Sequence, residues 1–316
     1  MYDLDYKLCT IIIPAYNSQD YIHDALNSIL SNKNHEEYIN VVVVDDCSTD
    51  KTKEIVKRYS LMHKNIFLYE KEKNGNWGSV INYVRDHKLV NSKYMMFLDS
   101  DDKIKNIFLK TLIKYDSKSN YDFLISKTSV VYFEKMKITI KPRYFIKAKN
   151  LIHSSPALIP VSLIIKSDIF YKTSNLEEGV SYQDFPFFLE ALKISKNPSF
   201  VNKTTGIYWF NRPGNTMSSQ WNKKRKLGEQ AAFNSLIKKG LCEYQLLKLL
   251  LHSYVSNLFN SKCKIYLEAS KVQKFLSYST LITRLLIKKQ IKKALKLNVL
   301  EFVYDSSKCK FEIYEN

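Results

Sequence analysis

The feature that most constrains the fold is a segment at residues 39–44 in which every residue except Asn40 is apolar. A strand that is apolar at successive positions is buried on both faces, as in parallel sheets covered by helices on each side. Apolar runs and helical spacing alternate along the first hundred residues, and they predict strands at 9–14, 39–44, 66–69 and 94–98 and helices at 18–30, 51–60 and 79–87. This order predicts a doubly wound α/β sheet with right-handed crossovers.

Acidic residues follow two of these strands directly. The clusters are Asp45-Asp46 after the second strand and Asp99-Ser100-Asp101-Asp102 after the fourth. Open α/β sheets bind ligands at the carboxyl ends of their strands, so the two clusters are expected at one edge. Mg²⁺ is usually held by one or two carboxylates together with substrate phosphates. The pattern therefore indicates a metal–diphosphate site, and the alternative is a solvated acidic turn.

Composition excludes several classes of protein. A hydrophobic content of 45% in 316 residues is that of a globular chain long enough for two domains. The five cysteines form neither a zinc spacing nor close pairs, which favours a reducing compartment. The N-terminus lacks the basic start and apolar core of a signal peptide, and no uncharged run of about 18 apolar residues predicts a membrane span. A cytoplasmic protein is expected.

Polar residues near the strand ends allow two interpretations. Tyr16 in the first loop could stack on a base, or it could be an exposed turn residue. Ser18 is expected to cap the helix at 18–30, and Ser48 or Asp50 is expected to cap the helix at 51–60. For Asp46 a functional role is favoured, because an acid at a buried strand end is costly unless it is paired or solvated.

Three motifs together resemble family 2 glycosyltransferases in order and spacing. They are Ile11-Ile12-Ile13-Pro14-Ala15-Tyr16-Asn17, Val43-Val44-Asp45-Asp46-Cys47-Ser48-Thr49-Asp50 and Phe97-Leu98-Asp99-Ser100-Asp101-Asp102. The resemblance covers about residues 8–220 and implies a GT-A fold, a nucleotide-binding sheet flanked by helices. It also implies transfer of a sugar, with inversion, from a nucleotide-sugar donor.

The resemblance implies a role for each residue of these motifs. Its donor site, for a UDP-sugar, would comprise Pro14, Tyr16, Asn17, Asp46, Asn82, Asp99, Ser100, Asp101 and Arg212. Asp46 would bind the base. Asp101, with Asp99 as its partner, would hold Mn²⁺ or Mg²⁺, and Asp102 would support them.

The family's acid pair corresponds to Gln183-Asp184, which makes Asp184 the candidate general base. A base is required because the acceptor hydroxyl must lose its proton as it attacks the anomeric carbon. The alternative role of Asp184 is to cap the helix expected at 185–195. A capping carboxylate engages one oxygen and leaves the other available, so the two roles are compatible.

The sequence departs from the family pattern at three positions. Cys47 stands where glycine is common, and Ile81 stands where an arginine usually contacts the diphosphate. That contact must come from elsewhere, and Arg212 or a lysine is the candidate. Gln183 replaces the first acid of the pair, which lowers the local negative charge and favours ionisation of Asp184.

The last hundred residues form a separate, basic region. Residues 221–316 contain 19 Lys and Arg against 7 Asp and Glu, a net charge of +12 out of the total of +18. We expect a catalytic domain at 1–220 and an all-helical C-terminal region at 221–316. Its basic helices could form a bundle or homo-oligomer, lie on an anionic membrane, or bind an acidic polymer.

Two other functions are weighed against the glycosyltransferase. The leading hypothesis is a metal-dependent glycosyltransferase acting on a growing cell-surface glycan, with a glycan, lipid-linked or glycoprotein acceptor. A sugar nucleotidyltransferase would be expected to have a glycine-rich phosphate loop, which residues 13–17 lack. A nucleic-acid-binding protein is motivated by the basic pI, but residues 1–220 are only modestly charged, so no nucleic-acid partner is expected.

Overall fold

The computed structural model of the chain describes residues 4–118, 120–132, 136–140 and 159–210. Beyond these it describes residues 228, 231, 232, 235, 303–305 and 310–312. The chain divides into two compact units, Met1–Ser219 and Gln220–Asn316. Within the described ranges, the helices are too short or too polar to cross a membrane.

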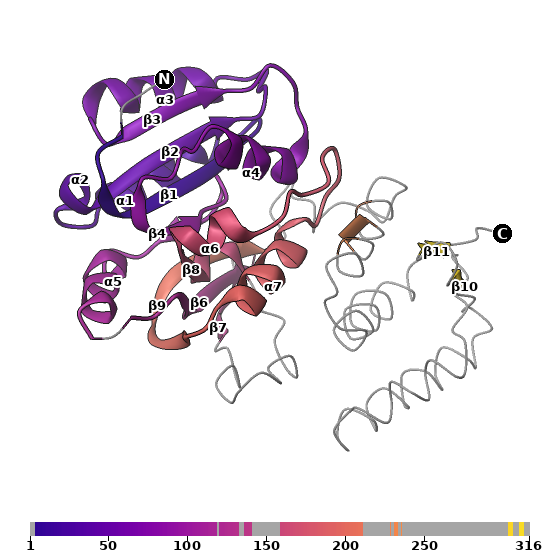
Figure 1. Ribbon diagram of the computed structural model, residues 1–316. Helices are drawn as coiled ribbons and strands as arrows, with labels where there is room; N and C mark the ends of the chain where they lie inside the picture. Colours follow the sequence, from indigo (N-terminus) through magenta and orange to yellow (C-terminus); the bar gives the residue numbers. More distant parts are fainter. Residues whose placement is uncertain are drawn as a thin grey trace. The chain divides into compact units, whose positions relative to one another are not determined.

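The first unit is built on a parallel sheet, as the alternation of elements predicted. Its four strands are β1 (Lys7–Ala15), β2 (Ile39–Asp45), β3 (Ile66–Glu70) and β4 (Ser92–Phe97). They lie in the order β3-β2-β1-β4, and each neighbouring pair is parallel (Figure 1). The chain therefore winds outward from β1 through β2 to β3, and returns to the other side of β1 at β4.

Beyond β4 the sheet is mixed rather than parallel. The added strands are β5 (Lys103–Ile104), β6 (Phe123–Tyr132), β7 (Met136–Ile140), β8 (Leu163–Lys166) and β9 (Pro198–Phe210). β8 is antiparallel to both β4 and β6, whereas β6 and β9 are parallel. β6 is a single unbroken strand over Phe123–Tyr132. No glycine or proline interrupts it, and an irregularity at 126–128 keeps it paired with β9.

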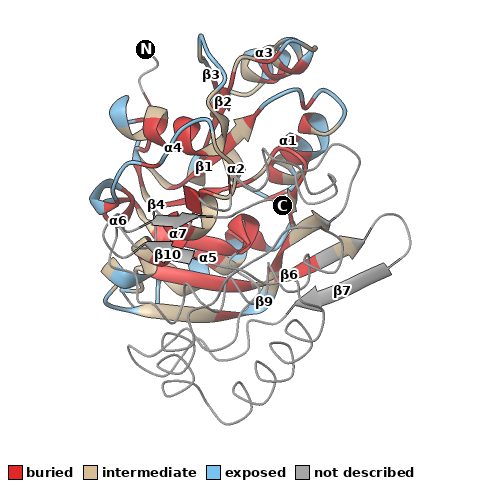
Figure 2. Cartoon of the chain, turned by 90° about the vertical axis from the view of Figure 1, so that its right-hand side faces the viewer, coloured by how far each residue is buried: buried red, intermediate tan, exposed pale blue. Residues whose placement is uncertain are grey.

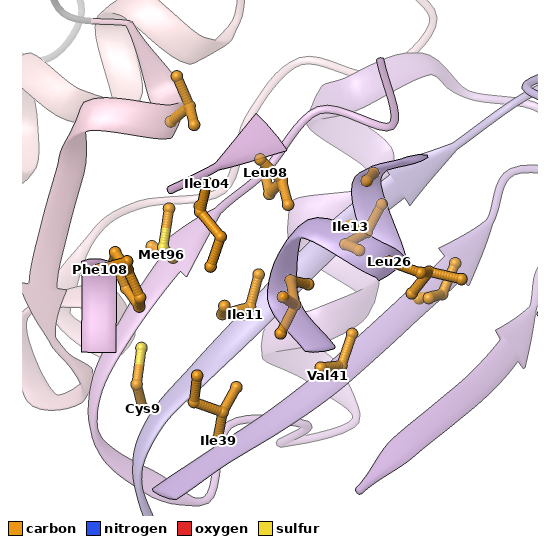
Figure 3. Close-up of a cluster of buried hydrophobic side chains, with 14 of the residues drawn as sticks. Cys9, Ile11, Ile13, Leu26, Ile39, Val41, Met96, Leu98, Ile104 and Phe108 are labelled. Atoms are coloured by element: carbon orange, nitrogen blue, oxygen red, sulfur yellow. The ribbon is translucent and has the colours of Figure 1, made fainter. Parts of the chain in front are cut away.

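One face of the sheet is covered by α1 (Ile22–Leu30), α3 (Thr52–Met62) and α5 (Phe108–Asp116). The core beneath them joins alternate residues of the strands, such as Ile11, Ile13 and Val41, to Leu26 of α1 (Figure 3). A short helix, α2 (His35–Tyr38), precedes β2. Burial of this apolar face contributes about 25 cal/mol for each Å² removed from water.

The other face is covered by α4 (Asn76–Asp86), α6 (Ser167–Lys172) and α7 (Asp184–Ile194). Its core is aromatic. The Phe97 ring of β4 lies 5.0 Å from the ring of Trp77 and 5.3 Å from that of Phe187, measured between centroids. Buried residues, red in Figure 2, run through the strands and into the helices on both sides. Because α4 and α7 pack on the same strand, their N-termini lie close to the end of β4.

The second unit is described at few positions. Gly228, Ala231, Ala232 and Ser235 are helical, while β10 (Val303–Asp305) and β11 (Lys310–Glu312) form an antiparallel pair. The expectation of an all-helical region is therefore wrong at residues 303–305 and 310–312, which form strands. The rest of the region at 221–316 lies outside the described residues.

Candidate active site

The candidate site lies where the order of the parallel strands reverses. The chain leaves β1 for β2 on one side and returns to β4 on the other, so the loops after β1 and β4 diverge there. Ligands of open α/β sheets bind in the crevice at such a point. The loop after β1 begins at Tyr16, and the loop after β4 carries Asp99 and Asp101.

The first two loops are tied together by Asn17. Its backbone N–H donates to Ser48 Oγ at 3.0 Å, and its Oδ1 accepts from the Thr49 N–H at 2.9 Å. Asn17 and Cys47 both have positive φ, at 46° and 65°. A left-handed conformation explains why glycine suits the position of Cys47. Tyr16, next to this junction, is 50% exposed.

Asp46 lies in a cationic corner rather than facing water. Its side chain is 3% exposed and forms an ion pair with the ammonium of Lys71, which is 11% exposed. The backbone N–H of Gly75 donates to both carboxylate oxygens, at 3.2 and 3.1 Å. Asn74 Nδ2 donates to the Asp46 carbonyl at 3.1 Å, and Lys71 also reaches Ser79 Oγ. Asp46 is thus fixed in orientation by the end of β3 and the start of α4.

The sequence did not single out Lys71. It suggested only that some lysine, or Arg212, would replace the arginine that usually contacts the diphosphate. Ile81, at the position where an arginine is usual, is fully buried in α4 and cannot contact a ligand. Asn74 was also missed as a site residue. The sequence alone does not distinguish Lys71 from the nearby lysines at 64 and 73. Lys71 differs from them in directly following the last residue of β3.

Ser18 and Ser100 connect the first loop to the acidic loop. Their hydroxyl oxygens are 2.6 Å apart, and both residues are buried. The expected capping role of Ser18 is wrong, because α1 begins at Ile22 and the Ser18 carbonyl, rather than its hydroxyl, accepts from the Tyr21 and Ile22 N–H groups. Asp50, in contrast, accepts from the Thr52 N–H at 2.9 Å at the start of α3.

The acidic loop converges on a tyrosine from β9. Asp102 Oδ1 accepts the backbone N–H of Trp209 at 2.9 Å, which fixes β9 against the loop. The pKa of the neighbouring Tyr208 phenol is raised by burial and then by four carboxylates, those of Asp102, Asp99, Asp184 and Asp101 in decreasing order. Asp99, Asp101, Asp102 and Asp184 therefore all act electrostatically on one phenol, which stays protonated at neutral pH. Tyr208 was missed because the sequence offers no motif around it.

Asp184 is the first residue of α7, and Gln183 rather than Asp184 occupies the N-cap position without a side-chain capping bond. Burial raises the pKa of the Asp184 carboxyl, although the backbone N–H groups of Phe185 and Asp184 partly offset that shift. A raised pKa brings a carboxylate toward the range useful for a general base. Gln183 is fully buried, and its amide has no hydrogen-bond partner within the described residues.

The remaining predicted residues are placed as follows. Pro14 lies in β1 opposite Val44 of β2, at the edge that carries the loops. The Asn82 side chain lies within α4 and bonds to the backbone of Leu176, so it faces the loop before α7. Arg212 lies outside the described residues.

The donor set fits a hard divalent cation. Asp99 and Asp101 offer carboxylate oxygens, the ligands that Mg²⁺ and Mn²⁺ prefer. In the described ranges no three side chains of the His, Cys, Asp or Glu type converge closely enough to hold a metal by themselves. A cation held by these carboxylates would take further oxygens from a bound diphosphate, the usual arrangement for Mg²⁺.

Curated relatives share most of the chain. An uncharacterized glycosyltransferase of Mycoplasma pneumoniae is 36% identical over 243 residues, which are 76% of this chain and 81% of the relative. The poly(ribitol-phosphate) beta-N-acetylglucosaminyltransferase TarS of Staphylococcus aureus is 30% identical over 219 residues, 67% of this chain and 37% of that protein.

Solved structures show the same fold. The crystal structure of S. aureus TarS 1-349 in complex with UDP-GlcNAc matches with a TM-score of 0.68 at 20% identity, covering 98% of this chain and 97% of that one. A mannosyltransferase of Pyrobaculum calidifontis in complex with GDP-Man and Mn²⁺ matches with a TM-score of 0.57 at 16% identity, covering 93% and 84%. The profile of glycosyl transferase family 2 matches residues 10–176, so this chain belongs to that family of glycosyltransferases and has its GT-A fold.

Proposed function

We propose that the protein transfers a sugar from a UDP-sugar to a hydroxyl group of a cell-surface glycan, with inversion at the anomeric carbon. The observation that carries the proposal is that the loop with Asp99 and Asp101 is bonded to β9 through Asp102 and Trp209 at 2.9 Å, next to Tyr208, whose pKa Asp184 also raises. In this arrangement Asp184 would act as the base, and Asp99 and Asp101 would hold the metal. A single displacement needs these two groups and no covalent intermediate.

Asp184 is the group proposed to remove the proton. The acceptor oxygen forms a bond to the anomeric carbon, the bond from that carbon to the diphosphate oxygen breaks, and the hydroxyl proton passes to the Asp184 carboxylate. The N–H groups of Phe185 and Asp184 orient that carboxylate at the start of α7. Its raised pKa makes it a stronger base than a solvated aspartate.

Asp101 and Asp99 are proposed to act on the leaving-group side. They would hold Mn²⁺ or Mg²⁺, and the bound ion would neutralise the charge that develops on the departing diphosphate. Tyr208 can donate a hydrogen bond to this group of carboxylates, because its pKa keeps the phenol protonated. With Ile81 buried in place of a basic residue, Lys71 is the described cation best placed to add positive charge near the nucleotide.

The nucleoside would occupy the corner formed by the first two loops. Tyr16 is exposed and can stack on the base, while Asp46 Oδ2, which accepts the Gly75 N–H, retains a lone pair that suits a ring N–H such as that of uracil. Pro14 and Asn17 shape the junction beside it. A uracil donor is supported by the solved TarS complex with UDP-GlcNAc, and a polymer acceptor by the name of TarS, which describes a transferase acting on poly(ribitol-phosphate).

Nucleotide binding provides the test of this proposal. In a thermal-shift screen with Mn²⁺, UDP and one UDP-sugar are expected to raise Tm by several degrees, and CDP to raise it less. A ligand present at 100 times its Kd adds about 2.7 kcal/mol of stability. If no UDP compound changes Tm while another nucleotide does, the donor assignment is wrong. If no nucleotide changes Tm, the proposed function fails.

Lys71→Met is expected to destabilise the protein by about 3–5 kcal/mol, because it leaves the buried Asp46 carboxylate without its counter-ion. Urea unfolding measures this change, and UDP affinity should fall with it. Lys53→Met is the matched control. Lys53 pairs at 3.6 Å with Glu70, the last residue of β3, and both side chains are exposed. Exposed pairs of this kind contribute at most about 1 kcal/mol. Equal effects of the two substitutions would contradict the assigned role of Lys71.

A further inference from the structure

Residues on one face of α4 form hydrogen bonds with the loop that precedes the candidate base Asp184. This loop, residues 173–183, connects α6 to α7 and ends next to Asp184. The Gly179 N–H donates to the Gly75 carbonyl at 2.7 Å. Arg85 at the far end of α4 donates to Thr173 Oγ1 at 2.8 Å and to Asn175 Oδ1 at 3.0 Å. The loop is thus bonded to α4 near both of the helix ends.

Asn82 makes the central contacts between α4 and this loop. Its Oδ1 accepts the Leu176 N–H at 2.9 Å, and its Nδ2 donates to the Leu176 carbonyl at 2.9 Å. Nδ2 also donates to Glu178 Oε1 at 2.9 Å, and Oδ1 also accepts from Arg85 at 3.3 Å. An amide has two donors and two acceptor sites, and all four are used here. Asn82 therefore has no hydrogen-bonding capacity left for a donor substrate.

The contact to Leu176 needs an amide specifically. Leu176 is buried, and Asn82 satisfies both its backbone N–H and its carbonyl. Buried backbone groups are almost always hydrogen-bonded, because an unpaired one costs about 1–3 kcal/mol. An aspartate could accept from the N–H but could not donate to the carbonyl. Alanine could do neither.

The loop lies directly against the α4 backbone. A Cβ atom added at Gly78 would be 2.6 Å from the Glu177 carbonyl oxygen and 3.3 Å from Gln183 Cγ. Real Cβ atoms do not approach a carbonyl oxygen that closely, so glycine is required for this packing. Because Gln183 adjoins Asp184, the separation between α4 and the loop determines where the Asp184 carboxylate lies.

We propose that Asn82 is a positioning residue of the transfer reaction, one that fixes the 173–183 loop so that Asp184 lies beside the Asp99–Asp102 loop. The proposal rests on the proposed function, since Asp184 is the base only in that reaction. It differs from the role that the sequence suggested for Asn82, because it assigns Asn82 to the catalytic step rather than to binding of the donor.

The test compares Asn82→Ala with Asp184→Asn and with the double variant. Asn82→Ala is expected to lower kcat about 10–100-fold while the Kd of UDP with Mn²⁺ changes less than about threefold. In the Asp184→Asn background it should lower kcat no further, because a loop that only positions Asp184 has nothing left to position. Tyr83→Phe, on the same helix but stacked on His87, is the matched control and should leave kcat unchanged.

Two outcomes would overturn the proposal. In one, UDP affinity falls in parallel with kcat, which would mean that Asn82 contacts the donor. In the other, the effects of Asn82→Ala and Asp184→Asn multiply. If Asn82→Ala does not fold, Asn82→Asp retains the acceptor contacts, loses both donated bonds, and is expected to follow the same pattern. A wild-type protein that is inactive with every nucleotide-sugar refutes the proposed function, whereas an active enzyme indifferent to Asn82 refutes only this inference.

Discussion

Replacing Asp184 with asparagine is expected to lower kcat for sugar transfer by about 10²–10⁴-fold, the usual contribution of a general base. The substitution keeps the size and the polarity of the side chain at the start of α7, but removes its ability to accept the proton. In the wild type, kcat should rise with pH as the Asp184 carboxyl, whose pKa burial raises, loses its proton. The variant should lose that rise. Steady-state rates across pH 4–8 with a UDP-sugar and Mn²⁺ measure both effects.

The same variant should be more stable than the wild type at neutral pH. Since burial raises the pKa of Asp184 above its usual 3.8, the folded state binds its proton more tightly than the unfolded state. Stability therefore falls as the pH rises from that usual value through the raised one. Asp184→Asn removes the buried charge, so its Tm should exceed that of the wild type at pH 7 and match it below pH 4.

Asp50 supplies a control of opposite sign. Burial acts to raise the pKa of its carboxyl, but hydrogen bonds from Thr52 and Gln19 outweigh burial and lower it. Asp50 therefore stabilises the fold above its usual pKa, and Asp50→Asn should lower Tm at pH 7. An Asp184→Asn variant that is less stable at pH 7 would contradict the account of a buried, destabilising base.

Replacing Asp101 with asparagine is expected to lower kcat/KM by about 10²–10⁴-fold and to raise the Mn²⁺ concentration needed for half-maximal activity. A metal ion at the leaving group stabilises the charge of the transition state by several kcal/mol. Each 1.36 kcal/mol of lost stabilisation lowers the rate tenfold, which gives the expected factor. An asparagine can offer one neutral oxygen in place of a charged carboxylate. A Mn²⁺ titration of the initial rate measures the change.

Asp24→Asn is the control for this prediction. Asp24 is an exposed acid of α1 paired with Lys103 at 2.6 Å, so its removal also lowers the negative charge near the acidic loop without touching the proposed ligands. Its metal dependence should equal that of the wild type. If Asp101→Asn showed an unchanged Mn²⁺ titration, Asp101 would not be the metal ligand.

The parallel half of the fold could be predicted because its signals are local. Continuous apolar runs such as 39–44 specify buried strands, and the helical spacing between them specifies crossovers. The mixed part of the sheet beyond β4 could not be predicted in this way. Its strands β8 and β5 are short, and their pairing depends on partners up to about a hundred residues away. The start of α1 was misplaced for a related reason. Ser18 is a good capping residue locally, but the Ser100 hydroxyl and the Thr52 side chain engage it instead.

The candidate site was predicted where its residues occur in motifs and missed where they do not. Asp46 and Asp99–Asp102 directly follow apolar strands, and Asp184 precedes a clear helix. Lys71 and Tyr208 have no such context. Each reaches the site only because its strand ends beside an acid, Lys71 at Asp46 and Tyr208 at Asp102. Tertiary pairing of this kind leaves no periodic trace in the sequence.

The anomeric configuration of the first released sugar tests the central claim most directly. In the absence of acceptor, the protein with Mn²⁺ and an α-linked UDP-sugar should slowly transfer the sugar to water, and proton NMR can follow the anomer before it equilibrates. A single displacement assisted by Asp184 predicts that the β-anomer appears first, and that Asp184→Asn abolishes the signal. Initial release of the α-anomer, or an undiminished rate in Asp184→Asn, would contradict the mechanism.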